Sequence, residues 1–416
     1  MKKALNNPSP NTFPEKPCSV EVADILRAHI AEYQKTYSLL PEQYKIVHNL
    51  LSCRTSMLGG HIEKCDNCGT ERISYNSCRN RHCPKCQHIP RERWLEARKA
   101  ELLPVSYFHN VFTLPHDLNS IVLFNKKVML NILFKAVSET LLTFGENPKN
   151  RLGGKAGFIA ILHTWNQMLN AHFHLHCLIP GGVMKENGAW KPCKKNYLFS
   201  VKALSKTFRG KFIDFMSEAY KAGKLEFPGI SSGLKNPDQF HRFKKTLYSK
   251  EWVVYVKPTV ARPEYVLEYL GRYTHRVAIS NHRVLSLKNG MVTFRYKDRK
   301  SGQNMTKTIS AVDFIRRFLK HSLPNRFVRI RHFGFLSNRV KKRNIERIRD
   351  SIGESEVTSK TDKKSIDEMM LKLTGVDITC CPCCKKGRMR VVYEIPKKMY
   401  SPISEVIRPP NLRKSA

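Results

Sequence analysis

Residues 171–180 have the sequence Ala-His-Phe-His-Leu-His-Cys-Leu-Ile-Pro, in which histidine alternates with an apolar residue. The three histidines are His172, His174 and His176. Successive side chains of a β-strand point to opposite faces of a sheet, so a strand here places the three imidazoles together, opposite the apolar side chains. Two imidazoles at positions i and i+2 can bind one divalent ion. We therefore predict a metal site on this strand, because packing alone does not explain strict alternation.

A catalytic metal site leaves coordination positions open for a substrate, so a third protein ligand from nearby is expected. The segment just before the strand offers two candidates, His163 and Gln167. The residue pattern alone does not choose between them.

Strand-like and helix-like patterns alternate around the histidine strand. Strands are predicted at residues 107–114, 158–164, 171–179, 252–256, 284–287 and 291–296. Helices are predicted in two segments of residues 20–53 and at residues 91–103, 118–144, 204–222 and 263–273. Consecutive strands with separate helices are typical of the α+β class with a central antiparallel sheet.

Cysteine spacing indicates metal binding near the N-terminus. Of the 13 cysteines, eight lie in CxxC pairs, and no secretory signal precedes them, which favours a reducing cytosol and metal ligands over disulfides. Two of these pairs are separated by a zinc-ribbon-like interval of 14 residues. We predict one structural Zn²⁺ on Cys65, Cys68, Cys83 and Cys86.

The remaining cysteines and histidines of this region leave an alternative open. A second zinc shell could use Cys53, His61, Cys78 and His82, or these residues could be polar side chains without a metal. Near the C-terminus two CxxC motifs overlap, and Cys381 and Cys384 are the better candidates for a pair of metal ligands. The sequence does not assign the partners of this pair.

The charge of the chain favours a polyanionic partner. Among 416 residues there are 73 Lys and Arg against 34 Asp and Glu, a formal net charge of +39 that is spread along the whole sequence. Nucleic acid is the expected partner, and no run approaches the ~18 apolar residues of a membrane span. A cytoplasmic protein is expected. In the cysteine-rich region the clustered cations Arg79, Arg81 and Lys85 suit DNA contact, although a solvated basic face has the same composition.

A tyrosine-rich segment is the second candidate for chemistry. Tyr265, Tyr269 and Tyr273 are spaced i, i+4, i+8 and share one face of the predicted helix. An aromatic core stripe is the alternative interpretation, but polar and basic residues, among them Arg272, His275 and Arg276, follow closely. A tyrosine can attack a phosphodiester if a metal polarises the phosphate.

Taken together, these motifs resemble the HUH endonucleases, and more closely the two-tyrosine rolling-circle transposases of bacterial insertion sequences, of the insertion-sequence-ninety-one type. Four stretches match in order, SYNSCRNRHCPKC, YFHNVFTLPHDL, LHTWNQMLNAHFHLHCLIPGG and YLGRYTHRVAISNHR, and they span roughly residues 50–340. A phenylalanine stands at position 173, where members of the family often have proline.

The resemblance implies the roles of individual residues. The metal-binding pair falls on His174 and His176, the third ligand on Gln167, and the nucleophiles on Tyr269 and Tyr273. It also implies Mg²⁺ or Mn²⁺ as the catalytic ion, and 5′-phosphotyrosine intermediates on single-stranded DNA at transposon ends and target sites. Arg272, His275 and Arg276 would offset phosphate charge.

On this basis we expect five parts in the chain. They are a disordered tail (1–19), a helical and zinc-binding DNA-recognition domain (20–103), an HUH catalytic domain (104–345), a linker (346–372) and a cysteine-containing basic segment (373–416). Two alternatives remain: a replication initiator or relaxase with the same chemistry, and a non-enzymatic zinc-containing DNA-binding regulator. The oligomeric state cannot be predicted.

Overall fold

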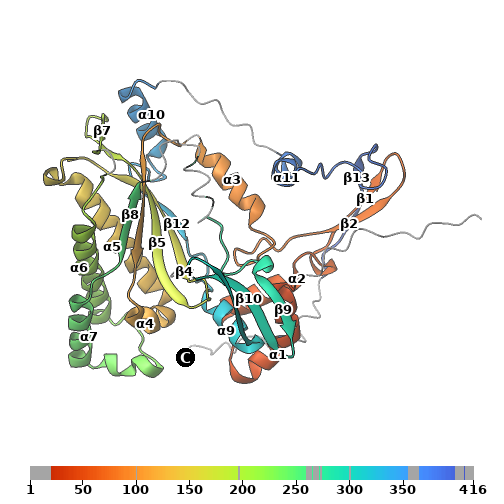
Figure 1. The fold of residues 1–416 in the computed structure, drawn as a ribbon, viewed down its shortest axis with the longest axis horizontal. Helices are drawn as coiled ribbons and strands as arrows, with labels where there is room; N and C mark the ends of the chain where they lie inside the picture. The colour runs from red at the N-terminus through yellow and green to blue at the C-terminus, as the bar shows by residue number, and fades with distance from the viewer. Residues whose placement is uncertain are drawn as a thin grey trace, which may run out of the picture.

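The computed structural model describes residues 20–99, 101–194, 197–258, 265, 271, 274–298, 301–354, 365–398 and 407 (Figure 1). A five-stranded sheet, with every neighbouring pair antiparallel and the order β12-β4-β5-β3-β8, lies at the centre of the larger lobe. Its strands are β3 (Tyr107–Thr113), β4 (Gly157–Trp165), β5 (Ala171–Pro180), β8 (Val254–Pro258) and β12 (Ile330–Gly334). The predicted α+β class and central antiparallel sheet are confirmed.

A layer of helices covers one face of this sheet (Figure 1). The apolar residues that alternate with the histidines on β5, Phe173, Leu175 and Cys177, are buried there in the main hydrophobic core. The covering helices are α4 (Asn119–Phe124), α5 (Lys126–Glu146), α6 (Val201–Lys221) and α7 (Pro237–Ser249). Burial of this face leaves the opposite one for the histidines.

The helix predicted at 118–144 is divided into α4 and α5 at Asn125. The Asn125 amide donates to the carbonyl oxygen of Glu226 at 2.7 Å and accepts from its backbone N–H at 2.8 Å, so a distant loop competes with helix continuation. By length and composition α5 is apolar enough to cross a membrane, but most of it is buried against the sheet and α6. A buried core helix of this kind is weak evidence for a membrane span.

A second core joins both ends of the described chain. The N-terminal helices pack against α9 and a three-stranded antiparallel sheet, β11-β10-β9. These elements are α1 (Val22–Thr36), α2 (Pro41–Ser52), β9 (Val284–Lys288), β10 (Met291–Lys297), β11 (Asn304–Ser310) and α9 (Ala311–Lys320). Helices α1 and α2 therefore share this core with elements between residues 284 and 320, on the other side of the domain boundary predicted after residue 103.

A third, smaller core lies on the histidine side of the central sheet. It packs α3 (His88–Lys99) and α10 (Lys341–Ser351) over apolar residues of β3, β4 and β5. The hairpin β6 (Gly182–Met184) and β7 (Trp190–Pro192) lies at its rim. Short 3₁₀ helices lie at Ser56–Leu58, His116–Leu118, Pro148–Asn150, Gly229–Lys235 and Asn281–Arg283.

The smaller lobe combines N-terminal and C-terminal segments (Figure 1). Its sheet has the order β13-β1-β2, so the last described strand pairs with the first. Its elements are β1 (Gly60–Cys65), β2 (Glu71–Tyr75), α11 (Ile366–Thr374) and β13 (Met389–Ile395). The predicted linker at 346–372 includes the end of α10 and most of α11. The tail expected at 1–19 lies outside the described residues, as do 355–364 of that linker.

Candidate active site and metal centres

Three imidazoles converge on the open face of the central sheet. His163 on β4 stands opposite His174 on β5 in the strand register, and His176 follows two residues later on the same face. A ligand nitrogen from each lies within 4.8 Å of the others. His163 and His174 are buried, whereas His176 is partly exposed. The predicted alternation on β5 thus brings His174 and His176 together, with a third histidine from the neighbouring strand.

The outer nitrogens of the β5 pair hold both rings in a ligand-like orientation. His174 Nδ1 lies 3.0 Å from the carbonyl oxygen of His172, which only accepts, so this nitrogen carries the proton. His176 Nδ1 lies 2.8 Å from His109 Nε2 on β3, and the two rings are stacked. Second partners of this kind fix the tautomer and direction of metal-binding histidines.

The remaining nitrogens have the spacing that one ion requires. His174 Nε2 and His176 Nε2 are 3.1 Å apart. Two nitrogens bound at right angles to an ion at about 2.1 Å are separated by about 3 Å. The donor set therefore fits a divalent cation with open positions. Burial, with the neighbouring His163 and His174, holds the pKa of His176 well below its usual value, and burial lowers that of His109 to about 4. Neutral imidazole is the ligand form.

The third histidine of the cluster is His163, and the ligand role expected for Gln167 stays a prediction. Gln167 lies in the turn between β4 and β5, beyond the end of β4, and its carbonyl oxygen accepts from Arg283 at 2.5 Å. His163 instead lies within the strand, in direct register with His174. Antiparallel pairing thus brings His163 beside the β5 histidines, a contact that the distance along the chain does not reveal.

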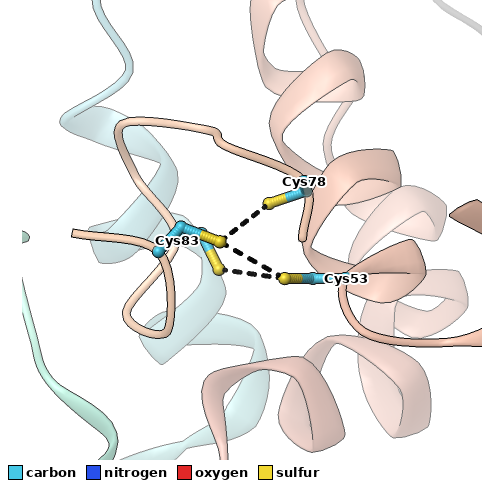
Figure 2. A group of neighbouring side chains, drawn as sticks. Cys53, Cys78 and Cys83 are labelled. Carbon is cyan, nitrogen blue, oxygen red and sulfur yellow. Dashed lines mark hydrogen bonds between the residues drawn. The ribbon is translucent and has the colours of Figure 1, made fainter. Parts of the chain in front are cut away.

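A tetrathiolate cluster lies entirely within the N-terminal region. Figure 2 shows Cys53, at the end of α2, and Cys78 directed toward the segment that carries Cys83. The sulfur atoms of Cys53 and Cys86 are 3.4 Å apart, and those of Cys53 and Cys83, and of Cys78 and Cys86, are 3.7 Å apart. Four sulfurs at about 2.3 Å from one tetrahedral zinc are about 3.8 Å apart. The four cysteines fit one structural Zn²⁺.

This grouping corrects the predicted zinc ligands. The two CxxC pairs do not share a cluster: Cys83 and Cys86 join Cys53 and Cys78, whereas Cys65 and Cys68 meet Cys381 and Cys384. The reason is that β1 carries Cys65 into the small lobe, away from the end of α2.

The two histidines proposed for a second zinc shell lie elsewhere. His61 is on β1, where its Nε2 lies 3.6 Å from a carboxylate oxygen of Glu63. Burial lowers the pKa of His82 to about 3, and its ring lines a cavity together with Arg81. Neither belongs to a metal-like group of His, Cys, Asp or Glu within the described part of the chain.

A basic groove of about 660 Å³ lies between α3, β12 and the N-terminal cysteine loop. Six cationic side chains line it, together with the rings of Trp94, Phe327 and His275. The described lining includes no carboxylate. The cations are Arg79, Arg81, Arg98, Arg326, Arg329 and Lys341. Burial, reinforced by Arg81, lowers the pKa of Arg329 to about 10, and an anion entering the groove would relieve this unfavourable charge.

The groove contains some of the cations predicted to contact DNA. Arg79, Arg81 and His275 line it, whereas Lys85 forms an ion pair with Glu21 at 2.7 Å. Arg276 is exposed and acts electrostatically on His176. Arg272 lies outside the described residues.

The predicted nucleophiles Tyr269 and Tyr273 also lie outside the described residues. Their described neighbours are on the histidine side of the sheet: Gly271 packs against Leu95 of α3, and the His275 ring lies 6.4 Å from that of Trp94 on the same helix. Tyr265, interpreted as a packing residue, is 51% exposed.

Two family models match the sequence. One, described as "Transposase zinc-binding domain", matches residues 25–114, and the other, described as "Putative transposase", matches residues 157–344. The chain is 44% identical over 374 residues to "Putative transposase y4qJ" of Sinorhizobium fredii, covering 89% of this chain and 94% of that protein. The chain belongs to the IS91 family of transposases.

A more distant relative supports the same assignment. The transposase is 26% identical over 345 residues to the "Transposase for insertion sequence element IS801" of Pseudomonas savastanoi pv. phaseolicola, covering 82% of each chain. No solved structure matches it. The match to the zinc-binding domain encloses all four cysteines of the first cluster, which supports structural zinc there.

One residue beside the histidine cluster of the transposase was not identified from the sequence. His109 lies in the predicted strand 107–114. It is the single histidine of that strand, so the sequence pattern does not indicate that its ring contacts His176. Only the pairing of β3 with β5 brings its ring to His176. The sequence indicated the basic groove in part, because residues 326–349 are rich in lysine and arginine.

Proposed function

We propose that this transposase nicks and transfers single-stranded DNA by HUH chemistry, through 5′-phosphotyrosine intermediates in rolling-circle transposition. The observation that carries the proposal is the convergence of His163, His174 and His176 on one open sheet face. The antiparallel sheet with a histidine pair on a central strand supports the HUH fold. Relatedness to transposases favours this role over that of a replication initiator or relaxase.

The histidines would hold Mg²⁺ or Mn²⁺, which would polarise the scissile phosphate and stabilise the charge that develops on it. The His172 carbonyl and His109 keep the rings of His174 and His176 in position for that role. Their Nε2 atoms are directed to one point, so little rearrangement is needed on binding.

The proposed nucleophiles are Tyr269 and Tyr273. A tyrosine oxygen would attack the phosphorus and break its bond to the 3′ oxygen. The fragment on the 3′ side of the break would then carry the phosphotyrosine at its 5′ end, and the fragment on the 5′ side would leave with a free 3′-OH. This hydroxyl can later attack a second phosphotyrosine and restore a DNA bond. Gly271 and His275, which are near the proposed nucleophiles in the sequence, lie beside α3, and this helix covers the histidine face of the sheet.

The basic groove is proposed to guide the DNA strand. Phosphates would lie along its cations, and Trp94 and Phe327 offer rings against which bases can stack. Ile330 of β12 lines the groove and is in register with Ile161, which pairs with His176. The groove is therefore about two strand spacings, roughly 10 Å, from the metal site.

A covalent-adduct assay tests the proposal. Single-stranded DNA from the ends of the element, labelled on the 3′ side of the expected nick, is incubated with full-length protein and Mn²⁺ and resolved on a denaturing gel. We expect a chelator-sensitive labelled adduct that is lost in the double variant Tyr269→Phe/Tyr273→Phe and retained in the control Tyr265→Phe. An adduct that persists in the double variant would exclude the proposed nucleophiles. DNA binding without any adduct would favour the non-enzymatic regulator.

A further inference from the structure

The second cysteine cluster joins segments that are more than 300 residues apart in the sequence. Cys65 and Cys68 lie at the end of β1 and in the turn after it, and Cys381 and Cys384 lie in the loop before β13. The sulfur atoms of Cys65 and Cys384, and those of Cys68 and Cys381, are 3.7 Å apart. All four lie within 4.8 Å of one another, as the sulfurs of the first cluster do.

Both halves of this cluster have the same local geometry. The backbone N–H of Gly69 donates to the carbonyl of Cys65 at 3.1 Å, and the N–H of Lys385 donates to that of Cys381 at 3.1 Å. Gly69 and Lys385 both have left-handed backbone conformations, with φ of 72° and 58°. A non-glycine residue adopts this conformation at a cost, so its repetition at the matching position indicates two equivalent knuckles.

Backbone amides are also directed at the sulfur atoms. Asn67 N–H donates to Cys65 Sγ at 3.4 Å, and Gly387 N–H donates to Cys384 Sγ at 3.3 Å. Gly387 lies so close to Cys65 Sγ that a Cβ at this position would overlap the sulfur. Such amides stabilise negative thiolates, which is the form that binds a metal.

The surrounding lobe has too little apolar material to fix this arrangement. Its buried cluster consists of Cys65, Cys381 and Met389, with Cys384 partly buried against them. Several large apolar side chains of its strands are exposed, among them Ile73, Val391, Val392 and Tyr393. Small units without a sufficient core are usually stabilised by a metal or a disulfide, and the cysteines of the described chain are free thiols.

We propose that Cys65, Cys68, Cys381 and Cys384 bind a second structural Zn²⁺ that attaches the C-terminal segment to the N-terminal zinc-binding region. The measured sulfur separations match the edge of about 3.8 Å of a tetrahedral tetrathiolate. Cys381 and Cys384 lie beyond both family matches, which end at residues 114 and 344. The ion would hold the turn after β1 to the loop before β13 and so stabilise the small lobe. This proposal does not depend on the catalytic proposal.

Zinc stoichiometry of the full-length protein is the first test. A weak chelator removes exchangeable ions before metal analysis, and we expect two tightly bound zinc ions per chain. The variant Cys381→Ser/Cys384→Ser should retain one, whereas the control Cys380→Ser/Cys383→Ser should retain two, because neither control residue belongs to the cluster. A single zinc in the unaltered protein, or two in the Cys381/Cys384 variant, would overturn the proposal.

A second test does not depend on the stability of the serine variant. A protease recognition sequence inserted between residues 354 and 365 allows the full-length protein to be cut after folding. We expect the C-terminal fragment to co-elute with the rest of the chain in zinc-containing buffer and to separate once a strong chelator removes the metal. A fragment that stays attached after complete zinc removal would show that the β1–β13 pairing suffices and would refute the proposed role of the ion.

Discussion

The histidines of the proposed metal site show how neighbouring groups orient single side chains. His174 donates a hydrogen bond from Nδ1 to the carbonyl oxygen of His172, and the Nδ1 of His176 is hydrogen-bonded to His109. With its Nδ1 protonated, His174 presents the lone pair of its Nε2, which lies 3.1 Å from His176 Nε2. The tautomer of His176 with its proton on Nδ1, toward His109, is the one in which its Nε2 can also bind the proposed ion.

The identity of the third ligand can be tested by comparing His163→Ala with Gln167→Ala. Loss of a hydrogen-bonding partner around a metal ligand commonly costs 10–100-fold in affinity or activity, so loss of a ligand should lower nicking by at least about 100-fold. We expect that loss for His163→Ala and near-normal nicking for Gln167→Ala. The measurement is the nicking rate as a function of Mn²⁺ concentration, with circular dichroism as a check on folding. The opposite ranking would restore Gln167 as the ligand.

Among the elements, the strand β12 ends at a glycine that its surroundings require. Gly334 ends the strand with φ of 62°, and a Cβ there would overlap the carbonyl oxygen of Ala156. The same strand begins at Ile330, which lines the basic groove. One end of β12 is therefore fixed by the close packing of Gly334, and the other end lines the groove in which DNA is proposed to bind.

The substitution Gly334→Ala should lower the free energy of unfolding by about 3 kcal/mol, because it combines a strained backbone with a steric overlap. Gly210→Ala is the matched control: Gly210 lies within α6 with open space around its Cα, and alanine there should stabilise by about 0.5–1 kcal/mol. Urea unfolding of both variants measures the difference. Equal stability of the two would show that β12 is not held as the structure has it.

In the molecule as a whole, positive charge is spread along the chain, and part of it lines the groove where DNA is proposed to bind. The groove gathers cations from the N-terminal cysteine loop, α3, the segment before β12 and α10. Segments distant in sequence thus supply one surface, and the N-terminal helices share a core with α9.

Salt dependence of single-stranded DNA binding tests the groove. Arg79 and Arg326 line it and are exposed, so Arg79→Gln/Arg326→Gln should remove two phosphate contacts with little effect on folding. At about 0.7 per contact, the slope of log affinity against log salt should become shallower by about 1.4. Lys206→Gln/Lys221→Gln on the distant helix α6 removes the same charge and serves as the control. An equal change in both double variants would assign the effect to net charge alone.

Local patterns in the sequence predicted much of the fold and its chemistry. Period-two alternation identified β5 with its histidine face. The cysteine spacing and the net charge indicated zinc and nucleic acid, and the motifs indicated the transposase family. These inferences succeeded because each depends on side chains within a few residues of one another, or on composition.

The composition of each site depended on contacts between distant segments. His163 and His109 reach the β5 histidines through the register of β4 and β3, and the two CxxC pairs near the N-terminus separate because β1 pairs with β13. The same long-range packing assigns α1 and α2 to a core with α9. Strand register and sheet order are set by the burial of whole faces, so spacing along the chain identifies candidate ligands, and folding selects which of them meet.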